Sequence, residues 1–258
     1  MKTVLKIAAL AVTLGLTSFS TAQAEQVKVA FGAEPYPPFT SLDASGKWVG
    51  WEIDFANAIC KQAKLDCVFT PIAWDGIIPA LTSKKVDMIV GSMSITEERM
   101  KTIDFSDKYY NTPTGVMGRK DEKFDATPEG LAGKIVAVQV STINQDYANK
   151  HFTGAAEIKE YQTQDEANQD LAAGRVDAVV ADAIALDVFL ASEAGACCEA
   201  KGNVADDPAI LGLGVGIGLR KEDTDLKATL NAAIKAIREN GTYDAISKPY
   251  FDFDIYGG

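Results

Sequence analysis

The chain carries the stretch Val-Asp-Met-Ile-Val-Gly-Ser-Met-Ser-Ile-Thr-Glu-Glu-Arg at residues 86–99. Its first five residues are mostly apolar or β-branched, which is typical of a short buried strand, and the next ones are small and hydroxylic. Thr96 and the two glutamates after it predict a helix start, because a hydroxyl caps free N–H groups and acids favour the positive helix end. Arg99 then lies in the first turn. A guanidinium beside Ser92, Ser94 and free N–H groups predicts a site for a carboxylate.

The same pattern occurs a second time. Residues 81–90 (Leu-Thr-Ser-Lys-Lys-Val-Asp-Met-Ile-Val) and 171–180 (Leu-Ala-Ala-Gly-Arg-Val-Asp-Ala-Val-Val) share the leucine, a basic residue, the Val-Asp pair and the final valine. Each copy predicts the end of a helix, a tight turn and a strand. Two residues beyond the last valine lie Ser92 and Asp182, respectively. The repeat therefore predicts two lobes that present a polar side chain at the same topological place.

Strands and helices alternate along the chain, which favours an α/β fold of parallel βαβ units. In such sheets ligands bind beyond the carboxyl ends of the strands. Polar or aromatic residues directly follow five predicted strands: Glu34, Trp74, Ser92, Ser141 and Asp182. We therefore expect a small-molecule cleft at these strand ends.

Three other segments carry definite expectations. Residues 34–39 contain three prolines, which predict a stiff loop that holds Glu34 and Tyr36 in place. Residues 212–219 alternate glycine with apolar residues, and no lysine follows at the spacing of a phosphate-binding loop, so they predict a closely packed strand. Residues 194–208 are small and polar and predict a loop.

The N-terminal residues predict export. Residues 1–24 carry two lysines, an apolar run too short to span a bilayer, and Ala-Gln-Ala at the end, which is the pattern of a cleavable signal peptide. We expect cleavage after Ala24 and a periplasmic location. Loss of the two lysines changes the formal net charge from −11 to −13, which argues against a nucleic-acid partner.

Four cysteines occur, at positions 60, 67, 197 and 198. Export favours disulfides, and a bridge between Cys60 and Cys67 can join the end of a helix to the next strand. Cys197 and Cys198 are adjacent and leave three alternatives open: a vicinal disulfide, two thiols, or pairing elsewhere. No cysteine pair has zinc spacing and the only histidine is His151, so we expect no metal site and no cofactor.

Six motifs resemble those of the periplasmic polar-amino-acid-binding proteins of ABC importers. They are Tyr-x-Pro-Phe (36–39), Gly-Trp-Glu-Ile-Asp-Phe-Ala (50–56), Trp-Asp-Gly-Ile-Ile-Pro-Ala-Leu (74–81), Ser-Met-Ser-Ile-Thr-Glu-Glu-Arg (92–99), Asp-Phe-Ser-Asp-Lys-Tyr-Tyr (104–110) and Gly-Thr-Tyr-Asp (241–244). The similarity covers essentially the whole mature chain. Lysine/arginine/ornithine, histidine and opine binders are most similar, since they share the spacing of Cys60 and Cys67 and the ending Tyr-Phe-Asp-Phe (250–253).

The resemblance implies a type II periplasmic-binding-protein clamshell, with a ligand cleft between two lobes joined by two crossover strands. Lobe 1 would comprise residues 25–112 and 209–258, and lobe 2 residues 113–208. The resemblance also implies the following ligand-binding set: Glu34, Tyr36, Trp74, Gly91, Ser92, Met93, Ser94, Arg99, Ser141, Thr142, Ile143 and Asp182.

Within that set, the resemblance implies that Arg99 holds the α-carboxylate of the ligand, with help from Ser94 and Thr142. Asp182 and Ser92 would hold the α-amino group.

Tyr36 and Trp74 would enclose the ligand side chain, and Glu34 would meet a distal positive charge. This chain departs from the family pattern in two places. Glu34 stands two residues before Tyr36 rather than three, and residues 141–144 contain one extra residue, which leaves the third position of that motif open between Ile143 and Asn144.

The function we expect is that of a monomeric receptor that closes on an L-amino acid, with a cationic side chain favoured, and docks on an ABC permease. Binding of opines or of polar uncharged or acidic amino acids is an alternative. A cyclohexadienyl-dehydratase-like enzyme is another, but it needs an acid over a leaving group, and Glu34 and Asp182 serve better as charge partners. A sensor domain would need a separately encoded partner.

Overall fold

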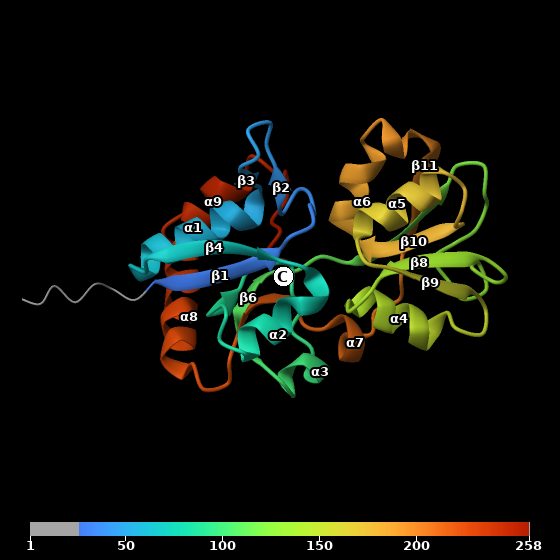
Figure 1. The fold of residues 1–258 in the computed structure, drawn as a ribbon. Coiled ribbons are helices and arrows are strands. Elements are labelled where there is room, and N and C mark those ends of the chain that lie inside the picture. Colours follow the sequence, from blue (N-terminus) through green and yellow to red (C-terminus); the bar gives the residue numbers. More distant parts are fainter. Residues whose placement is uncertain (1–25, 258) are drawn as a thin grey trace, which may run out of the picture.

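Two five-stranded sheets, each covered by helices, form two lobes (Figure 1). The structure is a computed structural model that describes residues 26–257, so the predicted signal peptide lies outside the described residues. The first sheet has the order β4-β1-β5-β12-β6, with β1 (Val27–Gly32), β4 (Cys67–Ile72), β5 (Met88–Ile89), β6 (Asp104–Tyr110) and β12 (Val215–Leu219). The second has the order β11-β7-β10-β8-β9, with β7 (Thr114–Arg119), β8 (Ile135–Gln139), β9 (Glu157–Tyr161), β10 (Ala178–Asp182) and β11 (Cys198–Asn203). A small hairpin joins β2 (Ser41–Leu42) to β3 (Trp48–Val49). The predicted α/β class and two-lobed fold are confirmed.

Each sheet is covered by its own set of helices (Figure 1). The first lobe carries α1 (Trp51–Ala63), the 3₁₀ helix η1 (Trp74–Gly76), α2 (Ile77–Thr82), α3 (Glu97–Met100), α8 (Thr224–Glu239) and α9 (Thr242–Ser247). The second carries α4 (Ile143–His151), α5 (Gln164–Ala172), α6 (Ala183–Leu190) and the 3₁₀ helix η2 (Ala194–Cys197). The short helix α7 (Pro208–Leu211) lies on the second passage between the sheets and contacts α4. Within residues 26–257, no helix has the length and apolar character needed to cross a membrane.

An aromatic cluster fills the core of the first lobe and fixes the start of α1. Trp51, Phe55 and Tyr109 are fully buried, and the rings of Phe55 and Tyr109 stack with centroids 4.2 Å apart. The hydroxyl of Tyr243, from α9, donates a hydrogen bond to the carbonyl of Tyr109 at 2.6 Å. Because Trp51 opens α1, this packing also places the next residue, Glu52, at the carboxyl end of the sheet.

The sequence repeat corresponds to two equivalent helix-turn-strand units, α2–β5 and α5–β10. The matching turn residues Lys84 and Gly174 both have a left-handed backbone, with φ of 62° and 69°. Asp87 accepts a hydrogen bond from a backbone N–H of β1 at 2.9 Å, and Asp177 accepts one from β8 at 2.7 Å. The repeat therefore has a structural cause, because each aspartate anchors its strand to the neighbouring parallel strand.

The predicted parallel βαβ units are present, since β1 pairs in parallel with β4 and β5 and β8 with β9 and β10, but each sheet also contains antiparallel pairs. β12 runs antiparallel to β5 and β6, and β7 runs antiparallel to β10 and β11. These exceptions flank the two passages of the chain between the lobes, where no βαβ crossover sets the direction.

The close packing predicted for residues 212–219 is confirmed, since a Cβ on Gly216 would lie 2.9 Å from the Ile95 side chain.

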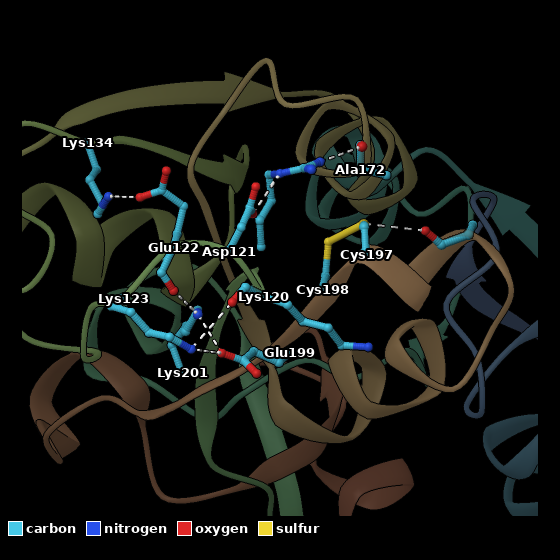
Figure 2. Close-up of polar contacts among 12 residues, drawn as sticks. Lys120, Asp121, Glu122, Lys123, Lys134, Ala172, Cys197, Cys198, Glu199 and Lys201 are labelled. Carbon is cyan, nitrogen blue, oxygen red and sulfur yellow. Dashed lines mark hydrogen bonds and ion pairs between the residues drawn. A yellow bond between two sulfur atoms is a disulfide. The ribbon is translucent and has the colours of Figure 1, made fainter.

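The loop predicted for residues 194–208 is also wrong in part, because η2 and β11 lie within it. Backbone pairing of β11 with β7 supplies hydrogen bonds that the small polar composition did not predict. Cys197 and Cys198 form a vicinal disulfide at the start of β11, which decides between the three alternatives (Figure 2). The bridge predicted between Cys60 and Cys67 is confirmed and joins α1 to β4.

Candidate ligand-binding cleft

A cavity of about 570 Å³ is lined by residues of both lobes, and its volume lies within the range of about 300 to 1,000 Å³ that is typical of small-molecule sites. Ten of the twelve predicted ligand-binding residues line it: Glu34, Tyr36, Trp74, Gly91, Ser92, Ser94, Arg99, Thr142, Ile143 and Asp182. The ends of β1, β4, β5, β8 and β10 therefore meet at one place, as the sequence predicts.

The other two residues, Met93 and Ser141, do not line the cavity. Met93 is fully buried in an apolar cluster of the first lobe, because it alternates with Ser92 and Ser94 and points to the opposite side. Ser141 is exposed at the rim, where its backbone carbonyl accepts a hydrogen bond from Trp74 Nε1 at 3.0 Å. Its main chain thus connects the second lobe to the first.

Arg99 lies in the short helix α3, whose start is capped by Thr96: the Thr96 hydroxyl accepts a hydrogen bond from the Arg99 N–H at 3.2 Å. The guanidinium donates to the carbonyl of Ser94 at 3.0 Å and to that of Ser141 at 3.4 Å. It also lies 5.8 Å from the centre of the Trp74 ring. Carbonyl oxygens therefore orient the guanidinium and leave further N–H donors of its fork for a ligand.

The charge of Arg99 has no ion-pair partner among residues 26–257, since none of the ion pairs found there includes it. Burial lowers the pKa of Arg99 to about 10, against an opposing effect of Asp146, and the group stays cationic at neutral pH. Arg99 is half-buried, and removing a cation from water without a carboxylate partner is unfavourable, so a ligand that supplies the opposite charge would be favoured.

The start of helix α4 contributes a second feature suited to an anion. Thr142 caps this helix: its hydroxyl accepts a hydrogen bond from the Gln145 N–H at 3.1 Å. Thr142, Ile143 and Asn144 all line the cavity, so both candidates for the third position of this motif are at the cleft. Free N–H groups at a helix start attract anions, as the guanidinium does.

Asp182 occupies the end of β10 and caps α6. Its Oδ1 accepts a hydrogen bond from the Ile184 N–H at 2.8 Å, and its Oδ2 accepts one from the Thr112 hydroxyl. Burial raises the pKa of Asp182 to about 6, although these hydrogen bonds lower it. Burial, followed by the charge of Asp182, raises the pKa of Tyr36, so Tyr36 stays neutral beside this carboxylate. The cleft therefore has an anionic end as well as a cationic one.

Glu34 and the two aromatic residues line the remaining wall. Glu34 is half-buried on the proline-rich loop, and Tyr36 on the same loop stacks on Phe39 with ring centroids 5.9 Å apart. Trp74 opens η1, directly after β4.

Several polar residues that line the cavity were not predicted from the sequence: Glu52, Lys108, Asn111, Thr112, Asn144 (named only as an alternative), Gln164 and Asp206. Glu52 is 2% exposed and accepts hydrogen bonds from Ser92 and Tyr109. The sequence contained one indication of this role: Glu52 lies at a helix start between Trp51 and Ile53, two residues that the core buries. Thr112 and Gln164 carried no comparable signal.

Comparison with known proteins agrees with this geometry. Residues 27–253 match the family model of the bacterial extracellular solute-binding proteins, family 3. The L-arginine-binding protein of Pseudomonas aeruginosa is 40% identical over 250 residues, which are 96% of this chain and 96% of the relative. The histidine-binding periplasmic protein of Salmonella typhimurium is 39% identical over 257 residues, which are 96% and 99% of the two chains.

A solved structure of an ancestral arginine-binding protein bound to arginine superposes with a TM-score of 0.81 at 34% identity, over 88% of this chain and 98% of that one. The family match, the two relatives and the fold therefore agree over nearly the whole described chain. The chain belongs to the bacterial extracellular solute-binding proteins, family 3.

Proposed function

We propose that the protein is the receptor of an ABC importer and that it binds an L-amino acid with a cationic side chain. The observation that carries this proposal is the half-buried guanidinium of Arg99, which has no ion-pair partner in the described chain and shares one cavity with the half-buried carboxylate of Asp182. An α-amino acid carries the two complementary charges on one carbon atom, and each charge-assisted pair adds affinity and stereospecificity. The named relatives bind arginine and histidine, which supports a cationic or basic side chain.

In this proposal Arg99, Ser94 and the start of α4 hold the α-carboxylate, while Asp182 and Ser92 hold the α-amino group. Met93 lies in the core and Ser141 does not line the cavity, so this proposal assigns neither of them a side-chain contact with the ligand.

Trp74 and Tyr36 would enclose the side chain of the ligand, and Glu34 would be the counter-ion of its distal charge. A guanidinium or an alkyl stem gains from an aromatic face, which favours arginine over small polar amino acids. The relatives are binding proteins, and this chain is a solute-binding protein rather than a dehydratase.

We further propose that residues 25–112 and 209–258 form lobe 1 and residues 113–208 form lobe 2, with ligand closure between them. The division of the sheets supports this, although α7, which spans the second boundary, packs on α4 of the second lobe. We also propose that the signal peptide is cleaved after Ala24, and that the mature protein acts in the periplasm as a monomer and docks on an ABC permease.

The test is titration calorimetry on mature protein that has been unfolded and refolded to remove carried-over ligand. The panel comprises arginine, lysine, ornithine, histidine, glutamine, glutamate, octopine and nopaline. We expect tight binding of cationic amino acids. Tight binding of glutamine or glutamate alone would remove Glu34 as the selector, and no binding across the panel would refute the proposed function.

A further inference from the structure

Glu52 is a buried carboxyl group at the cavity that the proposed function does not use. It is the second residue of α1, only 2% of it is exposed, and it lines the cavity. Its Oε1 accepts a hydrogen bond from the Ser92 N–H at 2.6 Å and another from the Tyr109 hydroxyl. Its Oε2 accepts one from the Ser92 hydroxyl at 3.0 Å. Ser92 is thus held twice by the same carboxyl group.

These two contacts fix both the backbone and the hydroxyl of Ser92. The backbone has φ of 54°, a left-handed conformation that non-glycine residues adopt rarely, and the hydrogen bond from its N–H stabilises it. A serine hydroxyl has one donor and two acceptor positions. A carboxylate can only accept, so the Ser92 proton points to Glu52 and the lone pairs of its oxygen remain for the cavity.

We propose that the Glu52 carboxylate sets the Ser92 hydroxyl as a hydrogen-bond acceptor toward the cleft and thereby selects a ligand that presents a protonated amino group there. Glu52 acts as a positioning residue, because it works through Ser92. This inference rests on the proposed function, in which Ser92 and Asp182 hold the α-amino group.

Protonation of Glu52 would reverse the arrangement. A carboxylic acid donates to the Ser92 oxygen, which turns the serine proton into the cleft, where it repels an ammonium group. The ionisable groups that surround Glu52 are Tyr109 and Tyr110 on β6, Tyr36 on the proline-rich loop, and Asp182 across the cleft. Burial raises the pKa of Glu52 to about 7, and the hydrogen bond from Tyr109 opposes this rise.

The inference therefore predicts that binding releases a proton near neutral pH. Only the ionised form of Glu52 suits the ligand, so affinity rises as pH rises through about 7 and then levels off. Asp182, whose pKa burial raises to about 6, contributes in the same direction at lower pH. A variant that lacks the Glu52 carboxyl group therefore separates the contribution of Glu52 to the pH dependence of binding from that of Asp182.

The experiment measures binding of L-arginine by calorimetry at pH 5.5 and pH 8, and at pH 7 in buffers of different ionisation enthalpy. Glu52→Gln keeps the shape of the side chain but donates to the Ser92 oxygen. At pH 8 we expect affinity to fall by at least about tenfold, the value of a charge-assisted hydrogen bond. At pH 5.5 the loss should be smaller, and proton release at pH 7 should decrease. The exposed Glu97→Gln, on α3, is the matched control and should change none of these values.

Two further variants distinguish positioning from general damage. In a Ser92→Ala background, Glu52→Gln should change affinity by less than about twofold, because its effect passes through the serine hydroxyl. Tyr109→Phe removes a hydrogen bond from the carboxylate and should move the midpoint of the pH profile upward. This shift tests the inference even if Glu52→Gln folds poorly.

The inference is overturned if Glu52→Gln binds L-arginine like the wild type at both pH values, if its effect persists undiminished without the Ser92 hydroxyl, or if Tyr109→Phe leaves the pH profile unchanged. These outcomes leave the proposed function intact, since the wild-type protein still binds. Failure of the wild type to bind any amino acid of the panel would instead refute the proposed function, and the inference with it.

Discussion

Replacement of Arg99 by alanine should abolish tight ligand binding without destabilising the ligand-free protein. In the described structure the guanidinium meets two carbonyl oxygens, at 3.0 and 3.4 Å, but it has no ion-pair partner. The ligand carboxylate would be that partner. Truncation of one member of a buried charge pair costs about 2 to 5 kcal/mol, which corresponds to a loss of affinity of about 30- to 5,000-fold.

The stability of the free protein provides the second half of this prediction. Since burial without an opposite charge is unfavourable, loss of Arg99 should leave the melting temperature unchanged or raise it, as is common for binding-site residues. Arg99→Lys keeps the charge but loses the planar fork, and it should fall between the wild type and Arg99→Ala in affinity.

The assay is calorimetry with L-arginine, paired with thermal unfolding of the ligand-free variants. Lys101→Ala removes the same charge from the position after α3, where the side chain is 70% exposed, and serves as the control. Affinity of Arg99→Ala within threefold of the wild type would refute the argument, and so would a variant that loses affinity only because it no longer folds.

Three further predictions concern lobe closure, pH and the disulfide. Trp74→Phe removes the hydrogen bond to the Ser141 carbonyl but keeps an aromatic face, so affinity for L-arginine should fall about 2- to 10-fold. Most of this loss should come from faster dissociation, measured by stopped flow. An unchanged dissociation rate would show that this contact does not hold the lobes together. The pKa of Glu52 is raised to about 7 in the folded state and is about 4 in the unfolded chain, so its contribution to stability is present below pH 4 and is lost as pH rises through 7. The melting temperature of the ligand-free protein should therefore decrease between pH 5 and 8, and Glu52→Gln should reduce this decrease; equal slopes for both proteins would contradict the raised pKa. Replacement of Cys60 and Cys67 by serine should lower the free energy of unfolding by about 2 kcal/mol, because the bridge closes a loop with a sequence separation of 7 in the unfolded chain. The melting temperature should fall by about 4 to 8 °C. An unchanged melting temperature would argue against the bridge in solution.

The sequence predicted much of this fold because its local signals agree with its tertiary structure. The repeat of residues 81–90 and 171–180 has a structural cause, because the aspartate of each copy anchors a strand to its parallel neighbour. Periodicity could not predict strand direction at the passages between the lobes, where direction depends on how the chain crosses from one sheet to the other. The strand β11 was missed for a similar reason, because its pairing with β7 depends on a partner about 80 residues away.

The lining of the cavity was predictable wherever a polar or aromatic residue follows a strand. Glu34, Trp74, Ser92 and Asp182 all reach the cavity by this rule, whereas Ser141 reaches only the rim. This rule did not identify cavity-lining residues that lie inside a helix or between the lobes. In the sequence Glu52 resembles an ordinary acid at a helix start, whereas in the structure it is buried beside Trp51 and lines the cavity.

We propose that one cleft recognises both the α-carboxylate and the α-amino group of an amino acid. Calorimetric comparison of L-arginine with agmatine, which lacks the α-carboxylate, and with 5-guanidinopentanoate, which lacks the α-amino group, tests it without any mutation. We predict that each analogue binds at least about 30-fold more weakly than L-arginine, because each leaves one buried charge of the protein without its partner. Affinities for the two analogues equal to that for L-arginine would contradict the claim.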